Sequence, residues 1–166
     1  CHRIIELSRK YESLDGTISG NNEIKKEVRD SNVSWIFPDK NSEWIFRRLV
    51  DTVNYLNDNF FKFDVYGFIE GLQFTNYKAP SGHYDKHTDN AYNNVVRKLS
   101  LTVQLSDPKD YDGGDLNFHT SSKFTTAEKE QGMVYVFPSY TLHQVTPVTR
   151  GERKSLVGWI TGPNFK

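Results

Sequence analysis

Apolar residues recur at helical spacing in the first third of the chain and predict two helices. A short first helix is predicted around Ile4, Ile5 and Leu7. A longer second helix is predicted to begin at one of two candidate caps, Asn41 or Ser42. The apolar stripe of this second helix consists of Ile45, Leu49, Val53 and Leu56. We expect both helices to bury these stripes against a sheet.

From Phe63 onward the pattern alternates with period two, which is typical of strands. The predicted strands are Val65–Tyr77, Leu99–Leu105, Asp115–His119, Gly132–Phe137, His143–Val148 and Ser155–Ile160. Turn residues separate them, including a turn at Gly151. Helices followed by many short strands predict an α+β, mainly β fold, namely a jelly roll with N-terminal helices packed on one sheet. Without a linker or repeat, we expect a single domain over residues 1–166, with a helical part at about 1–60 and a jelly-roll core at about 63–162.

Composition and charge narrow the possible functions. Hydrophobic residues make up 36% of the 166 residues, which is typical of a globular domain. The 21 basic and 21 acidic residues cancel, so no basic excess points to nucleic acid or to a membrane surface. No apolar run approaches the ~18 residues needed to cross a bilayer, and we expect a cytoplasmic protein. The single cysteine, Cys1, excludes an internal disulfide, and the helical character at Cys1 suggests that a short piece precedes it.

The strongest chemical signal is the motif His87-Thr88-Asp89, followed much later by His143. Residues two apart on a strand face the same side, so this motif directs an imidazole and a carboxylate to one point. A distant histidine on another strand can complete the set. Two histidines and one carboxylate bind one face of Fe(II) and leave positions open for a cosubstrate and O2. We therefore predict an iron site at His87, Asp89 and His143.

Two other interpretations of these residues remain open. A second motif of the same kind, His83-Tyr84-Asp85, precedes the first, and His83 with His87 has the spacing of a helical zinc pair. Pro80 and Gly82 disfavour a helix there, and no H-E-x-x-H signature is present, yet a zinc-dependent hydrolase stays an alternative. The other alternative is a non-catalytic jelly-roll module that binds a metal or ligand.

The stretch from Tyr77 to Asp89, with its Tyr, Gly, Tyr and H-x-D in that order, resembles the metal-binding strand of the prolyl 4-hydroxylase type of 2-oxoglutarate dioxygenases. The resemblance to that family continues in five later segments, residues 97–105, 110–116, 132–139, 147–153 and 157–160. The resemblance covers roughly residues 74–160. It implies a double-stranded β-helix, with Fe(II), 2-oxoglutarate and O2 as reaction partners and ascorbate as a possible reductant.

The resemblance also implies which residues hold the cosubstrate. The cations after the distal histidine are Arg150, Arg153 and Lys154. Strand period alone does not choose among them, whereas the family spacing chooses Arg153, whose planar fork suits the C5 carboxylate of 2-oxoglutarate. Tyr77 matches a tyrosine that hydrogen-bonds the cosubstrate. Gln104 falls where some relatives carry another tyrosine, and its amide could donate to the same carboxylate.

The implied activity is hydroxylation of an unactivated C–H, with a prolyl residue of a peptide or protein as the expected substrate and with succinate and CO2 as the other products. Tyr84 and Leu99 are expected to line the pocket, and Phe137 and Trp159 to belong to the core. No nucleic-acid or membrane partner is expected, and the sequence leaves the oligomeric state unspecified.

Overall fold

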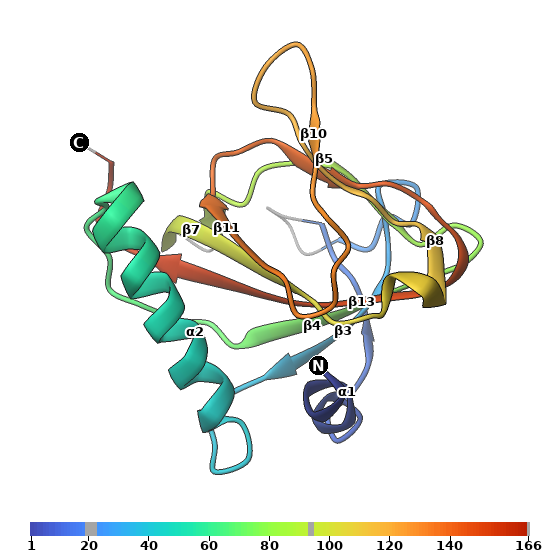
Figure 1. The fold of residues 1–166 in the computed structure, drawn as a ribbon, viewed down its shortest axis with the longest axis horizontal. Helices are drawn as coiled ribbons and strands as arrows, with labels where there is room; N and C mark the ends of the chain where they lie inside the picture. Colours follow the sequence, from blue (N-terminus) through green and yellow to red (C-terminus); the bar gives the residue numbers. More distant parts are fainter. Residues whose placement is uncertain (19–22, 93–94, 166) are drawn as a thin grey trace.

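The computed structural model describes residues 1–18, 23–92 and 95–165. Two antiparallel sheets face each other, and two helices cover the outer side of the larger sheet (Figure 1). The predicted fold class, a mainly β jelly roll with N-terminal helices on one sheet, is confirmed. None of the helices in the described part of the chain is long and apolar enough to cross a membrane.

The larger sheet has eight strands and supplies the floor of the fold. Its main path is β1 (Leu14–Asp15), β3 (Asn32–Ile36), β4 (Leu72–Lys78), β13 (Val148–Thr161), β7 (Val95–Gln104) and β11 (Val134–Pro138). Two short strands join it at the side, β6 (Ala91–Tyr92) on β7 and β8 (Tyr111–Gly113) on β13. The long strand β13 therefore lies at the centre, between β4 and β7.

The smaller sheet brings together segments that are far apart in the sequence. Its order is β10 (Thr125–Thr126), β9 (Leu116–Phe118), β12 (His143–Val145), β5 (His83–His87) and β2 (Arg29–Asp30). The register of β12 against β5 places His143 directly opposite His87.

The helices are α1 (His2–Ser8) and α2 (Glu43–Leu56), with a π-helical turn after α2 (Asn57–Phe61) and a short 3-10 turn before β8 (Pro108–Asp110). Ser42, one of the two predicted caps, is the N-cap of α2. Its hydroxyl accepts the backbone N–H of Asp39 at 2.9 Å, and the Asp39 carboxylate accepts the backbone N–H of Ser42 at 2.9 Å. This reciprocal pair fixes the turn that leads into the helix.

Two apolar clusters divide the interior. The larger lies between the helices and the larger sheet, and its members include Ile4, Leu7, Ile45, Leu49, Val53, Leu72, Leu101 and Leu156. The smaller lies between the two sheets and includes Tyr77, Tyr84, Tyr111, Leu116, Val145 and Val148. The face of the larger sheet that turns toward the smaller one also carries polar side chains, and these line a cavity.

Several predicted element bounds are wrong. The first third is not purely helical, because β1, β2 and β3 lie within it. The predicted strand Val65–Tyr77 begins only at Leu72, since the preceding segment contains Gly67 at a φ of +111°. The predicted break at Gly151 lies inside β13, where Gly151 pairs with Tyr111 of β8: Gly151 has a φ of +72°, and a Cβ there would lie 2.0 Å from the Asp110 carbonyl oxygen.

Truncation of Leu72 tests the packing of the larger cluster. Leu72 is fully buried, so Leu72→Ala should lower the free energy of unfolding by about 2–5 kcal/mol through lost burial and the cavity left behind. Urea denaturation followed by circular dichroism measures this. Val50→Ala on the exposed side of α2 should cost less than about 1 kcal/mol; equal losses for the two variants would contradict the assigned core.

Candidate metal centre

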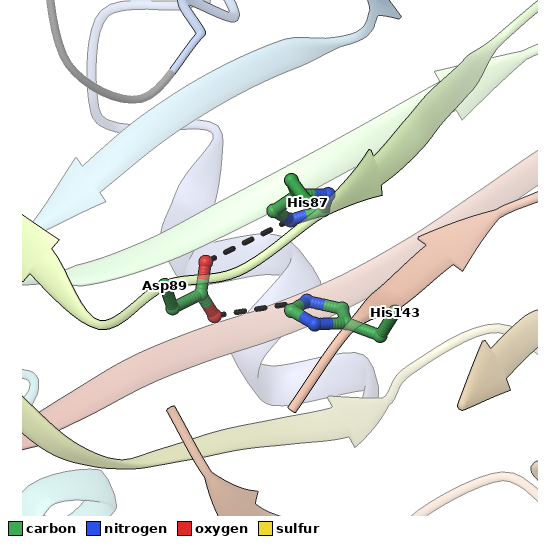
Figure 2. Close-up of side chains that lie close together, drawn as sticks. All are labelled: His87, Asp89 and His143. Carbon is green, nitrogen blue, oxygen red and sulfur yellow. Dashed lines mark ion pairs between the residues drawn. The ribbon is translucent and has the colours of Figure 1, made fainter. Parts of the chain in front are cut away.

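Three side chains from two neighbouring strands converge at one end of the space between the sheets (Figure 2). His87 ends β5, His143 begins β12, and Asp89 follows β5 by two residues. The carboxylate lies between the rings, with 3.7 Å from His87 Nε2 to Asp89 Oδ1 and 3.7 Å from His143 Nε2 to Asp89 Oδ2. One ligand atom from each residue lies within 4.8 Å of the other two.

Backbone carbonyls fix the orientation of both imidazole rings. The Nδ1 atom of His87 lies 2.7 Å from the carbonyl oxygen of Asp85, and that of His143 lies 2.9 Å from the carbonyl oxygen of Thr141. A carbonyl can only accept, so each Nδ1 carries the proton and each Nε2 keeps its lone pair. Both lone pairs belong to the atoms nearest the carboxylate. This tautomer leaves Nε2 of each ring free to bind a metal ion.

Asp89 is held by its own backbone N–H and by the Ser100 hydroxyl. The residue is 5% exposed, its N–H donates to the Ser139 carbonyl at 2.8 Å, and its Oδ2 accepts the Ser100 hydroxyl at 2.8 Å. The hydroxyls of Ser100 and Ser139 lie 3.0 Å apart. The carboxylate is therefore clamped from the larger sheet, although it belongs to the end of a strand of the smaller one.

Burial and mutual attraction set the protonation of the triad. Burial lowers the pKa of His87 to about 4, and the opposing attraction of Asp89 does not offset it. Burial alone would raise the pKa of Asp89, but His143 and His87 outweigh it and hold that pKa below its ordinary value. Near neutral pH the site therefore offers a neutral His87 imidazole and an anionic carboxylate.

The cavity beside the triad is lined by both sheets, and its charged lining residues are Arg29, Asp89, Arg97 and Arg153. Arg153 is 1% exposed, and its Nη2 donates to Gln104 Oε1 at 2.9 Å. Its Nε has no hydrogen-bond partner, and no carboxylate of the described residues pairs with it. A buried guanidinium of this kind lacks the anion that would offset its desolvation.

Tyr77 lies across from Arg153 in the register of β4 and β13, and the Arg153 guanidinium carbon is 5.5 Å from its ring centroid. Burial raises the pKa of Tyr77, so the phenol remains a hydrogen-bond donor. Gln104 lies behind Arg153 as an acceptor and does not itself line the cavity. Its predicted contact with a cosubstrate stays a prediction.

The other candidate cations lie outside the cavity. Arg150 is exposed and pairs with Asp112 at 2.6 Å, and Lys154 pairs with Glu152 at 2.7 Å on the opposite face of β13 from Arg153. The second H-x-D motif does not join the triad. The ring nitrogens of His83 face the carbonyl oxygens of Ser81 and Glu27, at 2.8 and 3.2 Å.

One expectation about the lining residues is corrected, because Leu99 belongs to the cluster under the helices. Phe137 and Trp159 are buried core residues as predicted, and both also line the cavity. Sequence reasoning also missed Ser100, on strand β7, and Arg29, which the structure brings into the cavity from the N-terminal third. Only the alternation along Leu99–Leu105, with polar residues at every second position, could have indicated Ser100.

Two histidines and one carboxylate lie at one end of the interior of this jelly roll. Beside them is a cavity with a buried arginine that no carboxylate of the described residues pairs with. This combination defines the class of non-haem iron oxygenases that use a dicarboxylate cosubstrate. Residues 72–161 match the family model described as the 2OG-Fe(II) oxygenase superfamily. The chain belongs to this superfamily.

Known proteins of the same kind resemble the chain in sequence and fold. A PKHD-type hydroxylase of Prochlorococcus marinus is 42% identical over 94 residues, which cover 55% of this chain and 42% of that relative. The viral collagen prolyl hydroxylase of Paramecium Bursaria Chlorella virus-1, in its 2OG complex, has a TM-score of 0.63 and 27% identity, covering 92% of this chain and 96% of that one.

A prolyl hydroxylase from Trichoplax adhaerens, in complex with a hypoxia inducible factor peptide fragment, has a TM-score of 0.79 at 18% identity, covering 96% of this chain and 75% of that one. This likeness shows the shared fold. The chain spans about two fifths of the length of the first curated relatives that it matches.

Loss of the hydrogen bond from the Ser100 hydroxyl to Asp89 should weaken metal binding without removing a metal ligand. Ser100→Ala leaves Asp89 Oδ2 without its hydroxyl donor, and partners of this kind typically contribute ~10-fold or more to metal affinity. Calorimetric titration with Co(II) measures the change. Ser121→Ala, at an exposed serine far from the triad in sequence, is the control. An unchanged Co(II) affinity in Ser100→Ala would show that metal binding does not depend on the Ser100 hydroxyl.

Proposed function

We propose that this chain is an Fe(II)- and 2-oxoglutarate-dependent dioxygenase that hydroxylates an unactivated C–H, most directly a prolyl residue of a peptide or protein, with release of succinate and CO2. The observation that carries the proposal is the occurrence of two features in one cavity. The first is the triad of metal-ligating side chains, and the second is the fully buried Arg153, which no carboxylate of the described residues pairs with.

The triad fits Fe(II) by the chemistry of its donors. His87 and His143 present Nε2 lone pairs, and Asp89 presents an anionic oxygen, all directed at a common centre. Three protein ligands on one face leave the opposite face open. When bound, the iron supplies oxygen activation coupled to oxidative decarboxylation of 2-oxoglutarate. The chain's contribution is to hold the ligand geometry through Asp85, Thr141 and Ser100.

The cosubstrate is oriented by its far carboxylate in this proposal. Arg153 offers an unpartnered Nε–H, and Gln104 and Ser155 fix its guanidinium before any ligand arrives. Tyr77 adds a phenol donor from the neighbouring strand. A rigid cation in a buried site binds a carboxylate without first having to reorganise.

The prolyl substrate rests on the relatives. The curated relatives are named PKHD-type hydroxylases, and the likeness in fold extends to prolyl hydroxylases, one of them bound to a peptide. The strand β5 and the loops that flank it border the triad and would border a bound peptide. Ascorbate as a reductant and a single domain over residues 1–166 stay predictions.

The zinc-hydrolase alternative loses its structural basis, because His83 lies outside the cluster that His87 forms with Asp89 and His143. A non-catalytic module that binds a metal or ligand remains the second candidate function for the same geometry. Turnover of 2-oxoglutarate distinguishes the dioxygenase from this module.

Removal of any triad ligand should abolish function. His87→Ala, Asp89→Ala and His143→Ala should each lose iron-dependent consumption of 2-oxoglutarate and the weak visible band of the anaerobic Fe(II)–2-oxoglutarate complex. Each deletion leaves only two protein ligands. Retained coupled turnover in any one variant would refute this ligand set, and absence of the band in the iron-loaded parent protein would refute the oxygenase itself.

Arg153 and Arg150 form a matched pair for the cosubstrate. Arg153→Ala should raise the 2-oxoglutarate requirement about 30-fold or more, because loss of a buried charged partner costs about 2 kcal/mol or more. Arg150→Ala, three residues earlier and exposed, should leave the requirement unchanged. Turnover measured against 2-oxoglutarate concentration decides this, and an effect of equal size in both variants would remove the assignment.

A further inference from the structure

Arg29 is a second buried arginine of the cavity, and neither the triad nor the cosubstrate site uses it. It lies on β2, at the edge of the smaller sheet, and is 7% exposed. Its side chain lines the same cavity as His87, Asp89 and Arg153. The sequence around it shows no sign of this role.

Neutral oxygens hold the Arg29 guanidinium in place. Its Nε donates to the Ser31 hydroxyl at 2.9 Å, its Nη1 to the Thr17 carbonyl at 2.8 Å and its Nη2 to Gln73 Oε1 at 2.7 Å. No carboxylate in the described part of the chain pairs with it. Each terminal nitrogen carries two hydrogens and has one acceptor among the described residues, which leaves one N–H on each for a ligand.

A stack of three groups connects Arg29 to the triad. Its guanidinium carbon lies 4.6 Å from the ring centroid of Tyr84, and the Tyr84 ring stacks on His87 with centroids 3.5 Å apart and planes at 15°. Arg29 therefore lies on the metal side of the cavity.

The charges of the loaded cavity do not cancel without a further anion. Arg97 is neutralised by Glu70, to which it donates at 2.8 and 2.5 Å. Arg29, Arg153 and a divalent metal against Asp89 leave three positive charges, and the 2-oxoglutarate dianion removes two of them. One positive charge then remains on buried groups, and an unpaired buried charge is costly unless a counter-charge binds.

We propose that Arg29 is an anion subsite of this cavity that binds a carboxylate carried by the substrate. This inference deepens the proposed function and rests on it. The substrate that is hydroxylated then carries a carboxylate close to the reacting carbon. The preset fork of Arg29, fixed by Ser31, Thr17 and Gln73, suits a carboxylate more than a neutral amide.

The test compares two probes that differ only in charge, N-acetyl-L-proline and N-acetyl-L-prolinamide. Each is titrated into protein loaded with Zn(II) and saturating 2-oxoglutarate. Binding is followed by tryptophan fluorescence, because Trp35 and Trp159 both line the cavity. The acid should bind about tenfold more tightly than the amide, the size expected for a desolvated charge pair. 2-Oxoglutarate binding is measured separately in every variant.

Three variants separate charge recognition from structural support. Arg29→Gln should remove the preference for the acid, Arg29→Lys should keep part of it, and Arg47→Gln, the same change at an exposed site on α2, should keep all of it. No preference in the parent, or an undiminished preference in Arg29→Gln, overturns the proposal. So does a tenfold weaker 2-oxoglutarate affinity in Arg29→Gln, which would assign Arg29 to the cosubstrate. Failure of the parent to bind 2-oxoglutarate would instead refute the proposed function.

Discussion

The pairing of β12 with β5 is the constraint on which the candidate site depends. It places His143 opposite His87, although the two are 56 positions apart in the sequence. A shift of one residue in this register would turn one imidazole away from the other. The pairing is held on its far side by β9, whose Phe118 also lies opposite His143. The metal geometry is thus a consequence of strand register in the smaller sheet.

The larger sheet completes the site from the other side. Ser100 on β7 reaches Asp89, and Arg153 on β13 faces the same cavity from a position that would be core in an ordinary sandwich. The outer face of these strands packs against the helices through Leu99, Leu101 and Leu156. One face of the sheet therefore provides the apolar burial that stabilises the fold, and the other carries the polar and charged groups of the site. This division explains how a domain of this size can bury such groups and remain folded.

The sequence predicted the parts of this arrangement that follow from local pattern. Period-two alternation predicts the strands, and the H-x-D spacing predicts that His87 and Asp89 point the same way. It could not predict that Asp89 lies beyond the strand end, because its position depends on hydrogen bonds to Ser139 and Ser100, which are distant in sequence. The turn predicted at Gly151 is wrong for a related reason, since glycine is typical of turns, whereas the place of Gly151 inside β13 depends on its pairing with the distant Tyr111.

Arg29 was beyond prediction because its environment is made mostly by residues distant in the sequence. Its three acceptors come from residues 17, 31 and 73, and its stacking partner Tyr84 comes from a fourth segment. In a sequence with balanced charges, nothing distinguishes an arginine held by neutral oxygens from one on the surface. Burial without a counter-ion is the distinguishing property, and Arg153 shares it. A cavity that keeps two such cations is suited to hold two anionic groups at once.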